Sequence, residues 1–373
     1  MIALPSFDAP LADHPLAVRL DRSGPADFAD EPLYPPLCRL IARSPGLLAL
    51  LDAAPPTQRL PNLILAALHH QVLRAGSKDG LGGWYASAGG TRSPDDPALP
   101  AALAAFANRH AEALQQLIAT RRTQTNEVGR CAVLKPALDE IARHHGPQLA
   151  LFDFGCSAGL NLAVDRYRYD YRGDASGGLP CRVVGAAPEA LAAPPAWTLA
   201  ARCGVDQATI DVQDDDALRW LMACLWPSDA PRRERLAMAV AETRALRPAV
   251  IQAEDGLAVL ETWLDELPAG VVPVLFNSWV LFYFAPADLA AHVARVRRLV
   301  QQRGLLWLSA EGAAHNQPLA PELQLPTTPV PGEPGASPGN QTFWLLTEPG
   351  DGAPRTRLLA RSHPHGAWLA WRA

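Results

Sequence analysis

The sequence predicts an α/β protein with a doubly wound, mainly parallel sheet that follows an all-helical N-terminal region. Up to about residue 146 the apolar residues recur at helical spacing. After residue 148 short apolar runs alternate with helical stretches, which is typical of a parallel sheet. We therefore divide the chain into a helical region, residues 1–122, and an α/β domain, residues 123–373.

Helix signals dominate the first region. We expect helices over 60–76, 100–122 and 126–146. Pro61 near the start and Gly76 just past the end are the usual boundary residues of the first helix. Pro136 should kink the third helix and Gly146 can cap it.

Strand signals follow in the second region. The expected strands are 149–154, about 199–205, 248–253, 271–276, 304–309, 341–348 and the segment 355–372. Residues 167–186 have the pattern of an inserted hairpin. Residues 313–340 are rich in Pro and Gly, so we expect a long loop there.

Composition narrows the range of functions. The net charge of -5 gives no general attraction to nucleic acid or to an anionic membrane. The longest apolar run, residues 271–284, is shorter than the roughly 20 residues that a bilayer span needs. The first residues do not form a secretion signal, so we expect a cytoplasmic protein. The six cysteines form no C-x-x-C pair, and we expect no metal site.

The turn after the first strand, Gly155-Cys156-Ser157-Ala158-Gly159, fits more than one chemistry. As G-x-S-x-G it is the nucleophile elbow of a serine hydrolase, with Ser157 as nucleophile, Asp255 as acid and His363 or His365 as base. Such an elbow normally follows several strands, whereas about 145 residues with helical periodicity precede this one. The pattern G-x-G-x-x-G of dinucleotide-binding proteins is not met.

With Asp153 the turn becomes D-x-G-x-S-x-G, which resembles the first motif of S-adenosylmethionine-dependent methyltransferases. The resemblance implies a Rossmann-like, methyltransferase-type domain that binds this cofactor. Asp153 would bind near the methionine end, and Gly155 and Gly159 would let the backbone approach the ligand. Ser157 stands where the middle glycine is usual, and Asn161 follows in the same cofactor-binding segment.

Acids at the ends of later strands continue the resemblance. Asp206 ends the second strand, where the family usually holds the ribose hydroxyls; Asp211 is the alternative. Asp255 follows the third strand, where an acid often meets the adenine amino group, but it could equally cap the next helix. We expect residues 214–216 to cap only the helix that follows them.

Polar residues also end the fourth and fifth strands. Asn277 and Ser278 lie at the carboxyl end of the fourth strand, where ligands of open α/β sheets bind. Glu311 follows the fifth strand and would line the same edge. The Asp/Asn-Pro-Pro-Tyr motif of amino-methylating enzymes is not present, so that substrate class does not carry over.

The stretch "TQTNEVGR", residues 123–130, concentrates Gln124, Asn126, Glu127 and Arg130 at the start of a helix. These side chains could contact the acceptor or the carboxylate of the cofactor. Alternatively, Thr125 or Asn126 caps the helix and Glu127 complements its dipole. His365 is a further candidate for contact with substrate.

Several stretches are similar to a bacterial family of unknown function, domain of unknown function 2332. They are "QTNEVGRCAVLKPAL", "GCSAGLNLAVDRYRYDY", "DVQDDDALRWLMACLWP", "FNSWVLFYF", "SAEG" and "PHGAWLAW". The resemblance implies a methyltransferase-like fold with a helical N-terminal region and no established reaction.

The hypothesis from sequence is an S-adenosylmethionine-binding protein, a methyltransferase of a small-molecule acceptor that requires no metal, nucleic acid or membrane. Glu127, Asn277 and Glu311 would orient or deprotonate the acceptor. Gln124, Asn126, Arg130, Ser278 and His365 would bind substrate. The alternatives are a serine hydrolase that uses Ser157 and a non-catalytic binding module on the same fold.

Overall fold

A computed structural model describes residues 14–28, 30–77, 80–124, 126–172, 178–321, 323–326, 328, 330 and 340–371 of the chain. The chain divides into two compact units. One comprises Met1–Thr125 with Ile210–Leu236, and the other comprises Asn126–Thr209 with Ala237–Ala373.

The first unit is helical, as the sequence predicts. Its helices are α1 (Pro15–Asp27), α2 (Tyr34–Ala42), α3 (Pro45–Leu50), α4 (Pro61–Ala75), α5 (Leu99–Arg109), α6 (Ala111–Thr120), α9 (Asp215–Ala223) and the first part of α10 (Ala230–Leu246). Short 3-10 helices are η1 (Leu51–Ala53), η2 (Pro56–Gln58), η3 (Gly80–Trp84) and η4 (Ala86–Ala88). No helix among the described residues of the chain combines the length and apolarity that crossing a membrane requires.

The helix expected over 100–122 is in fact two helices. His110 leaves helical geometry with φ -109° and ψ 18°, and α5 ends before it. Its ring packs on Phe106, with 4.5 Å between ring centroids. No Pro or Gly marks this break, so the sequence pattern gave no sign of it.

The second unit contains the sheet. Its strands are β1 (Gln148–Phe154), β4 (Arg182–Val184), β5 (Thr198–Asp206), β6 (Ala249–Gln252), β7 (Val272–Ser278), β8 (Leu306–Glu311), β9 (Thr342–Glu348), β10 (Arg355–Ser362) and β11 (Trp368–Trp371). They form a nine-stranded mixed sheet in the order β4-β11-β10-β9-β8-β7-β1-β5-β6. Every strand expected from the apolar runs is confirmed.

The helices of this unit are α7 (Cys131–His145), α8 (Glu189–Ala192), the second part of α10, α11 (Gly256–Glu266), α12 (Pro286–Arg303) and α13 (Ala313–Asn316). The 3-10 helices of this unit include η5 (Val128–Arg130), η6 (Leu160–Ala163), η7 (Leu281–Tyr283) and η8 (Gln317–Leu319). As expected, α7 contains Pro136 and ends at Gly146. Beyond η8, the described residues among 320–330 of the expected loop over 313–340 form no helix or strand.

The inserted hairpin expected over 167–186 is wrong. Strands β2 (Tyr169–Asp170) and β3 (Leu179–Pro180) do pair, but they run parallel and form a separate two-stranded sheet. The next strand, β4, instead joins the edge of the large sheet beside β11. A parallel pair needs a crossover rather than a tight turn, so the turn residues in this stretch did not identify the pairing.

Five neighbouring strands, β6, β5, β1, β7 and β8, run parallel. In order along the chain they are the third, second, first, fourth and fifth of this set, so the strand order reverses between β1 and β7. The carboxyl ends of β1 and β7 lie on either side of that reversal. In open α/β sheets this is the position where ligands bind.

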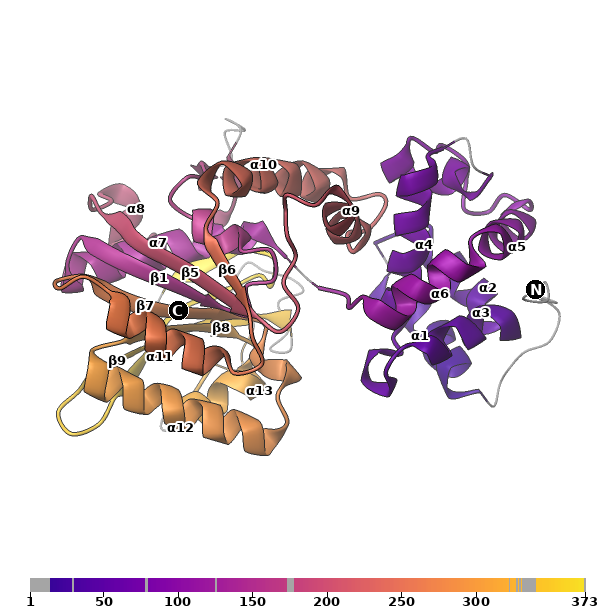
Figure 1. The fold of residues 1–373 in the computed structure, drawn as a ribbon. Helices are drawn as coiled ribbons and strands as arrows, with labels where there is room; N and C mark the ends of the chain where they lie inside the picture. Colours follow the sequence, from indigo (N-terminus) through magenta and orange to yellow (C-terminus); the bar gives the residue numbers. More distant parts are fainter. Residues whose placement is uncertain are drawn as a thin grey trace. The chain divides into compact units, whose positions relative to one another are not determined.

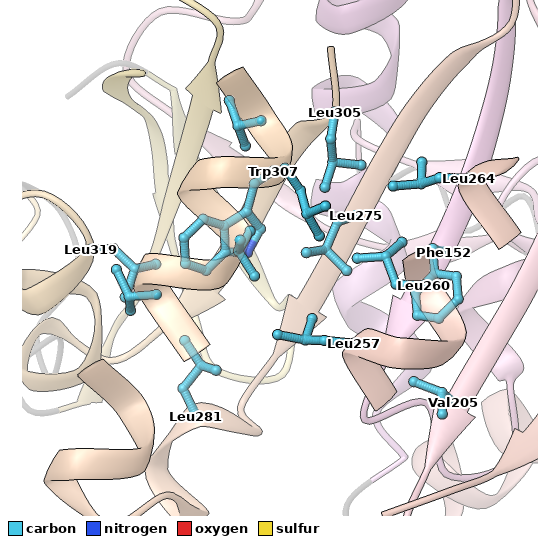
Figure 2. Packing of buried hydrophobic residues seen from close by; sticks show 14 of the residues in the cluster. Phe152, Val205, Leu257, Leu260, Leu264, Leu275, Leu281, Leu305, Trp307 and Leu319 are labelled. Atoms are coloured by element: carbon cyan, nitrogen blue, oxygen red, sulfur yellow. The ribbon is translucent and has the colours of Figure 1, made fainter. Parts of the chain in front are cut away.

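One face of the sheet packs on α11 and α12, which cover it in Figure 1. Phe152, Leu275 and Trp307 project from β1, β7 and β8 into this core, where Leu260 of α11 meets them (Figure 2). All four side chains are fully buried. Neighbouring residues of a strand point to opposite faces, so Asp153 turns to the other face, which Figure 1 shows lined by α7.

We expect Leu260→Ala to lower the free energy of unfolding by about 2–5 kcal/mol, because it leaves a cavity in a closely packed core. Ile251→Ala on β6 is the control, since 40% of Ile251 is exposed. Urea denaturation of both variants measures the difference. Equal stability of Leu260→Ala and the control variant would contradict this packing.

Candidate functional site

The turn after β1 is held against the end of β5. The N–H groups of Gly155 and Cys156 both donate to the carbonyl of Val205, at 2.8 and 3.1 Å. Gly155 and Gly159 have φ of 77° and 68°, a region that favours glycine. A Cβ on Gly155 would lie 2.5 Å from Val280 Cγ2.

A Cβ on Gly159 would likewise lie 2.8 Å from Val250 Cγ2 of β6. Both glycines therefore leave room for valine side chains of the protein. The sequence-based expectation was that they leave room for a ligand. The segment after the turn forms only the short 3-10 helix η6.

Ser157 also has left-handed backbone geometry, with φ 52°, although it is not glycine. Its N–H donates to Asp206 Oδ2 at 2.9 Å, and its hydroxyl accepts a hydrogen bond from Asn126 Nδ2. The Asn126 side-chain oxygen accepts from the N–H of Ala158 at 3.2 Å. The predicted residues Asn126, Ser157 and Asp206 thus meet in one hydrogen-bonded group.

Asp153 lies directly beneath the turn and is 1% exposed. Asn161 Nδ2 donates to its carboxylate at 3.1 Å, and Cys131 Sγ of α7 donates to the Asn161 oxygen at 3.3 Å. Burial raises the pKa of Asp153 to about 7, and the neighbouring charge of Asp206 adds to the shift. The hydrogen bond from Asn161 partly offsets it.

Arg130 extends its buried guanidinium between two loops. Its Nε donates to the carbonyl of Pro364 at 2.7 Å, and Nη1 lies 3.3 Å from Ser278 Oγ at the end of β7. The guanidinium carbon lies 5.9 Å from the centre of the Trp279 ring. Its charge also lowers the pKa values of Asp153 and Glu311, although burial has the larger effect on both.

The loop from His363 to Gly366 packs closely on η5. A Cβ on Gly366, whose φ is 74°, would lie 2.1 Å from the carbonyl oxygen of Gly129. A Cβ on Gly129 would lie 2.4 Å from the carbonyl oxygen of His365. The two glycines allow this backbone contact, which brings the "NEVGR" and "SHPHG" segments together and places His365 beside the site.

At the ends of β7 and β8, Asn277 and Glu311 form a buried network. Asn277 Nδ2 donates to Glu311 Oε1 at 2.8 Å and its oxygen accepts from Trp307 Nε1 at 2.6 Å. The N–H groups of Val280 and Leu281 donate to the same Glu311 oxygen. Within the described part of the chain, Glu311 Oε2 is buried without a hydrogen-bond partner. Burial raises the pKa of this carboxyl to about 7.

Glu127 and Asp255 are held in helix-capping contacts, and Gln124 lies in the other unit. Glu127 is buried and caps η5 through a hydrogen bond from the N–H of Gly129, at 3.0 Å. Asp255 is exposed, accepts from the N–H groups of Leu257 and Ala258 as the N-cap of α11, and pairs with Arg295 at 2.9 Å. Gln124 belongs to the helical unit, so the geometry of the sheet unit does not include it.

The three groups of the hydrolase triad have other contacts. Ser157 bonds to Asn126, and Asp255 caps α11 and pairs with Arg295. The Nδ1 atom of His363 accepts from the N–H of His365 at 3.0 Å. Asp255, the acid of the triad, therefore already has hydrogen-bond and ion-pair partners. It follows β6, and β5 separates β6 from β1 and the Ser157 turn.

A ligand at this edge can reach the half-buried side chains of Asn126, Asp206, Ser278 and His365 directly. Asp153, Asn277 and Glu311 lie behind them, each no more than 1% exposed. A cavity of about 870 Å³ lies elsewhere, at the amino ends of the parallel strands, between His145, Glu348 and Arg355. No cluster of three or more His, Cys, Asp or Glu in the described ranges could hold a metal ion.

Three groups of this site were not predicted from the sequence. Trp307 and Cys131 lie inside apolar stretches, and Pro364 contributes through its backbone carbonyl. The side-chain types of these residues do not distinguish them from ordinary core residues.

A family model with the description "Uncharacterized protein conserved in bacteria (DUF2332)" matches residues 21–371. A comparison with curated proteins gave no match.

We expect the stability of the protein to fall as pH rises from about 5 to 8, in part because of Glu311. Its pKa is about 7 in the folded protein, whereas the ordinary value is 4.5. The folded protein therefore holds this proton more tightly, so the stabilisation is complete below pH 4.5 and is lost as the pH rises through about 7. Glu311→Gln removes this contribution, which is at most about 3 kcal/mol. Urea denaturation at pH 5 and pH 8 measures it, and the same pH profile in both proteins would contradict it.

Proposed function

The chain belongs to the bacterial family DUF2332, and we propose that its sheet unit is a Rossmann-like, methyltransferase-type domain. It binds S-adenosylmethionine at the reversal between β1 and β7 and transfers the methyl group to a small-molecule acceptor. The observation that carries the proposal is a pair of carboxylates, Asp153 and Asp206, at the carboxyl ends of neighbouring strands around a glycine turn.

The strand order supports this assignment. The order of the five parallel strands is that of dinucleotide- and nucleoside-binding α/β folds, in which the ligand lies over the first strand. Asp206 ends the strand next to β1 and is half-buried, so it can accept hydrogen bonds from ribose hydroxyls. Asp153 lies on the methionine side of such a ligand.

The charges of the site suit this cofactor. S-adenosylmethionine carries a sulfonium and an amino group, which are cationic, and one carboxylate. Asp153 and Asp206 favour the cationic groups, and the Arg130 guanidinium favours the carboxylate. The site therefore contains partners for each charged group of the ligand.

Ser157 fits the proposed motif through its backbone. Its φ of 52° is the conformation for which glycine is normal, and methyltransferases usually have glycine at this position. Asn126 supports the serine hydroxyl. The short η6 departs from the longer helix that usually follows this motif, so fewer N–H groups point at the ligand.

The acceptor side has its own polar groups. Ser278 and His365 are half-buried beside Arg130 and can contact the acceptor. In the reaction the acceptor atom forms a bond to the methyl carbon as the carbon–sulfur bond breaks and the sulfonium becomes a thioether. Holding the two reactants in line can supply roughly 7–11 kcal/mol of the barrier.

Asn277 and Glu311 act through other residues in this proposal. Both amide atoms of Asn277 are bonded within the protein, and Glu311 accepts the N–H groups that follow β7. They fix the position of the segment from Ser278 to Leu281. Glu127 has a similar role in η5, through its hydrogen bond from Gly129.

We expect S-adenosylmethionine and its demethylated product to bind the purified protein, as measured by calorimetry. Asp206→Asn keeps an acceptor for the Ser157 N–H but removes the charge, so we expect affinity to fall at least roughly tenfold. Asp288→Asn in the exposed first turn of α12 is the control. No binding of either compound at high micromolar concentration would refute the proposal. Binding without turnover across many acceptors would indicate a non-catalytic binding module.

A serine hydrolase remains the second candidate because Ser157 has the strained backbone expected of a nucleophile elbow. The contacts of Asp255 argue against it. We therefore expect no labelling of the protein by a fluorophosphonate probe. Labelling that is lost in Ser157→Ala, with Ser309→Ala as the control, would establish the hydrolase instead.

A further inference from the structure

The helical unit contains a cavity of about 150 Å³ that the function proposed for the sheet unit does not use. Residues of α4, of α6 and of α9 line it. The side chains with polar groups at the cavity are His70, Gln71, Arg74, Gln116, Thr120, Arg121 and Asp216. All of them belong to the same compact unit.

His70 is the unusual member of this group. It is 1% exposed, and neither ring nitrogen makes a well-aligned hydrogen bond to a described residue. Its Nε2 lies 3.2 Å from Asp216 Oδ1, close enough for an ion pair if the ring is protonated. A buried imidazole without hydrogen bonds is costly unless a ligand or a proton completes it.

The charges around the cavity are mainly positive. Asp216 is already paired with Arg121 at 3.0 Å and with Arg219 at 2.7 Å. The guanidinium of Arg74, in the last turn of α4, makes no hydrogen bond or ion pair with the described part of the chain. Arg74, Arg121 and His70 therefore line the cavity together with a single carboxylate, Asp216. Two arginines already pair with that carboxylate.

We propose that this cavity binds a small oxyanion, such as phosphate, sulfate or the carboxylate of a small molecule. Arg74 and Arg121 supply the charge, and His70, Gln71 and Thr120 supply hydrogen bonds. The volume of about 150 Å³ accommodates a tetrahedral oxyanion but not a nucleotide. Guanidinium groups are well suited to such ligands because they donate parallel hydrogen bonds.

Binding should also take up a proton at His70. In the free protein burial lowers the pKa of His70 below its ordinary value of 6.5, and the charges of Arg219 and Arg121 lower it further, whereas Asp216 raises it. An anion beside the ring favours the charged imidazole. Binding is therefore stronger at lower pH.

Calorimetry with sulfate tests the site, because the charge of sulfate does not change between pH 6 and pH 8. We expect tighter binding at pH 6 than at pH 8. Arg74 is exposed, so Arg74→Gln should not disturb folding, and we expect it to weaken binding at least roughly tenfold. Arg39→Gln, at an exposed arginine of α2 outside the cavity, should bind as the wild type does.

Two further arms complete the experiment. His70→Gln should retain some binding but lose the difference between pH 6 and pH 8. Titrations with phosphate and with acetate at pH 6 show whether the site prefers tetrahedral oxyanions or carboxylates, since the preferred class binds more tightly. The proposal is overturned if sulfate, phosphate and acetate all fail to bind wild type, or if Arg74→Gln binds sulfate as tightly as Arg39→Gln.

Discussion

The buried guanidinium of Arg130 connects the parts of the proposed active site. A buried charge is costly unless it is paired and hydrogen-bonded. Arg130 meets this requirement with the Pro364 carbonyl, Ser278 Oγ and the charges of Asp153 and Glu311. Each partner lies on a different element, so η5, the end of β7 and the loop before β11 are fixed around one side chain.

The same constraint explains the glycines of "NEVGR" and "SHPHG". Arg130 can reach the Pro364 carbonyl because Gly129 and Gly366 let their two backbones approach. Arg130 was predicted for its charge at a helix start, and His365 was predicted separately. The contact between the two segments was not predictable, because they are more than 200 residues apart and no local pattern connects them.

The central strands were predictable because β1, β7, β8 and β9 are largely buried, and burial on both faces gives such strands a short apolar run. The sequence predicts a doubly wound, mainly parallel sheet, and the structure adds the strand order, which reverses between β1 and β7 where the proposed ligand would bind. Tertiary contacts set the rest. The break at His110, the parallel pairing of β2 with β3 and the return of Ile210–Leu236 to the helical unit have no local signal.

The candidate site residues were also predictable in part: local sequence signals indicated their positions, but not their distant partners. The helix caps of Asp255 and Asp214 were among the expected contacts, but the ion pairs of Asp255 with Arg295 and of Asp216 with Arg121 were not, because these partners are distant in sequence. The two acids with raised pKa values, Asp153 and Glu311, lie on either side of Arg130 in the proposed active site.

With pKa values near 7, these acids are only partly ionised at neutral pH, which limits the net negative charge around Arg130. A cationic ligand above Asp153 favours its ionised form. The proposed cofactor would therefore bind more tightly as pH rises through 7, the direction opposite to that expected for an anion in the cavity of the helical unit. The two proposed sites can accordingly be distinguished by the sign of their proton linkage.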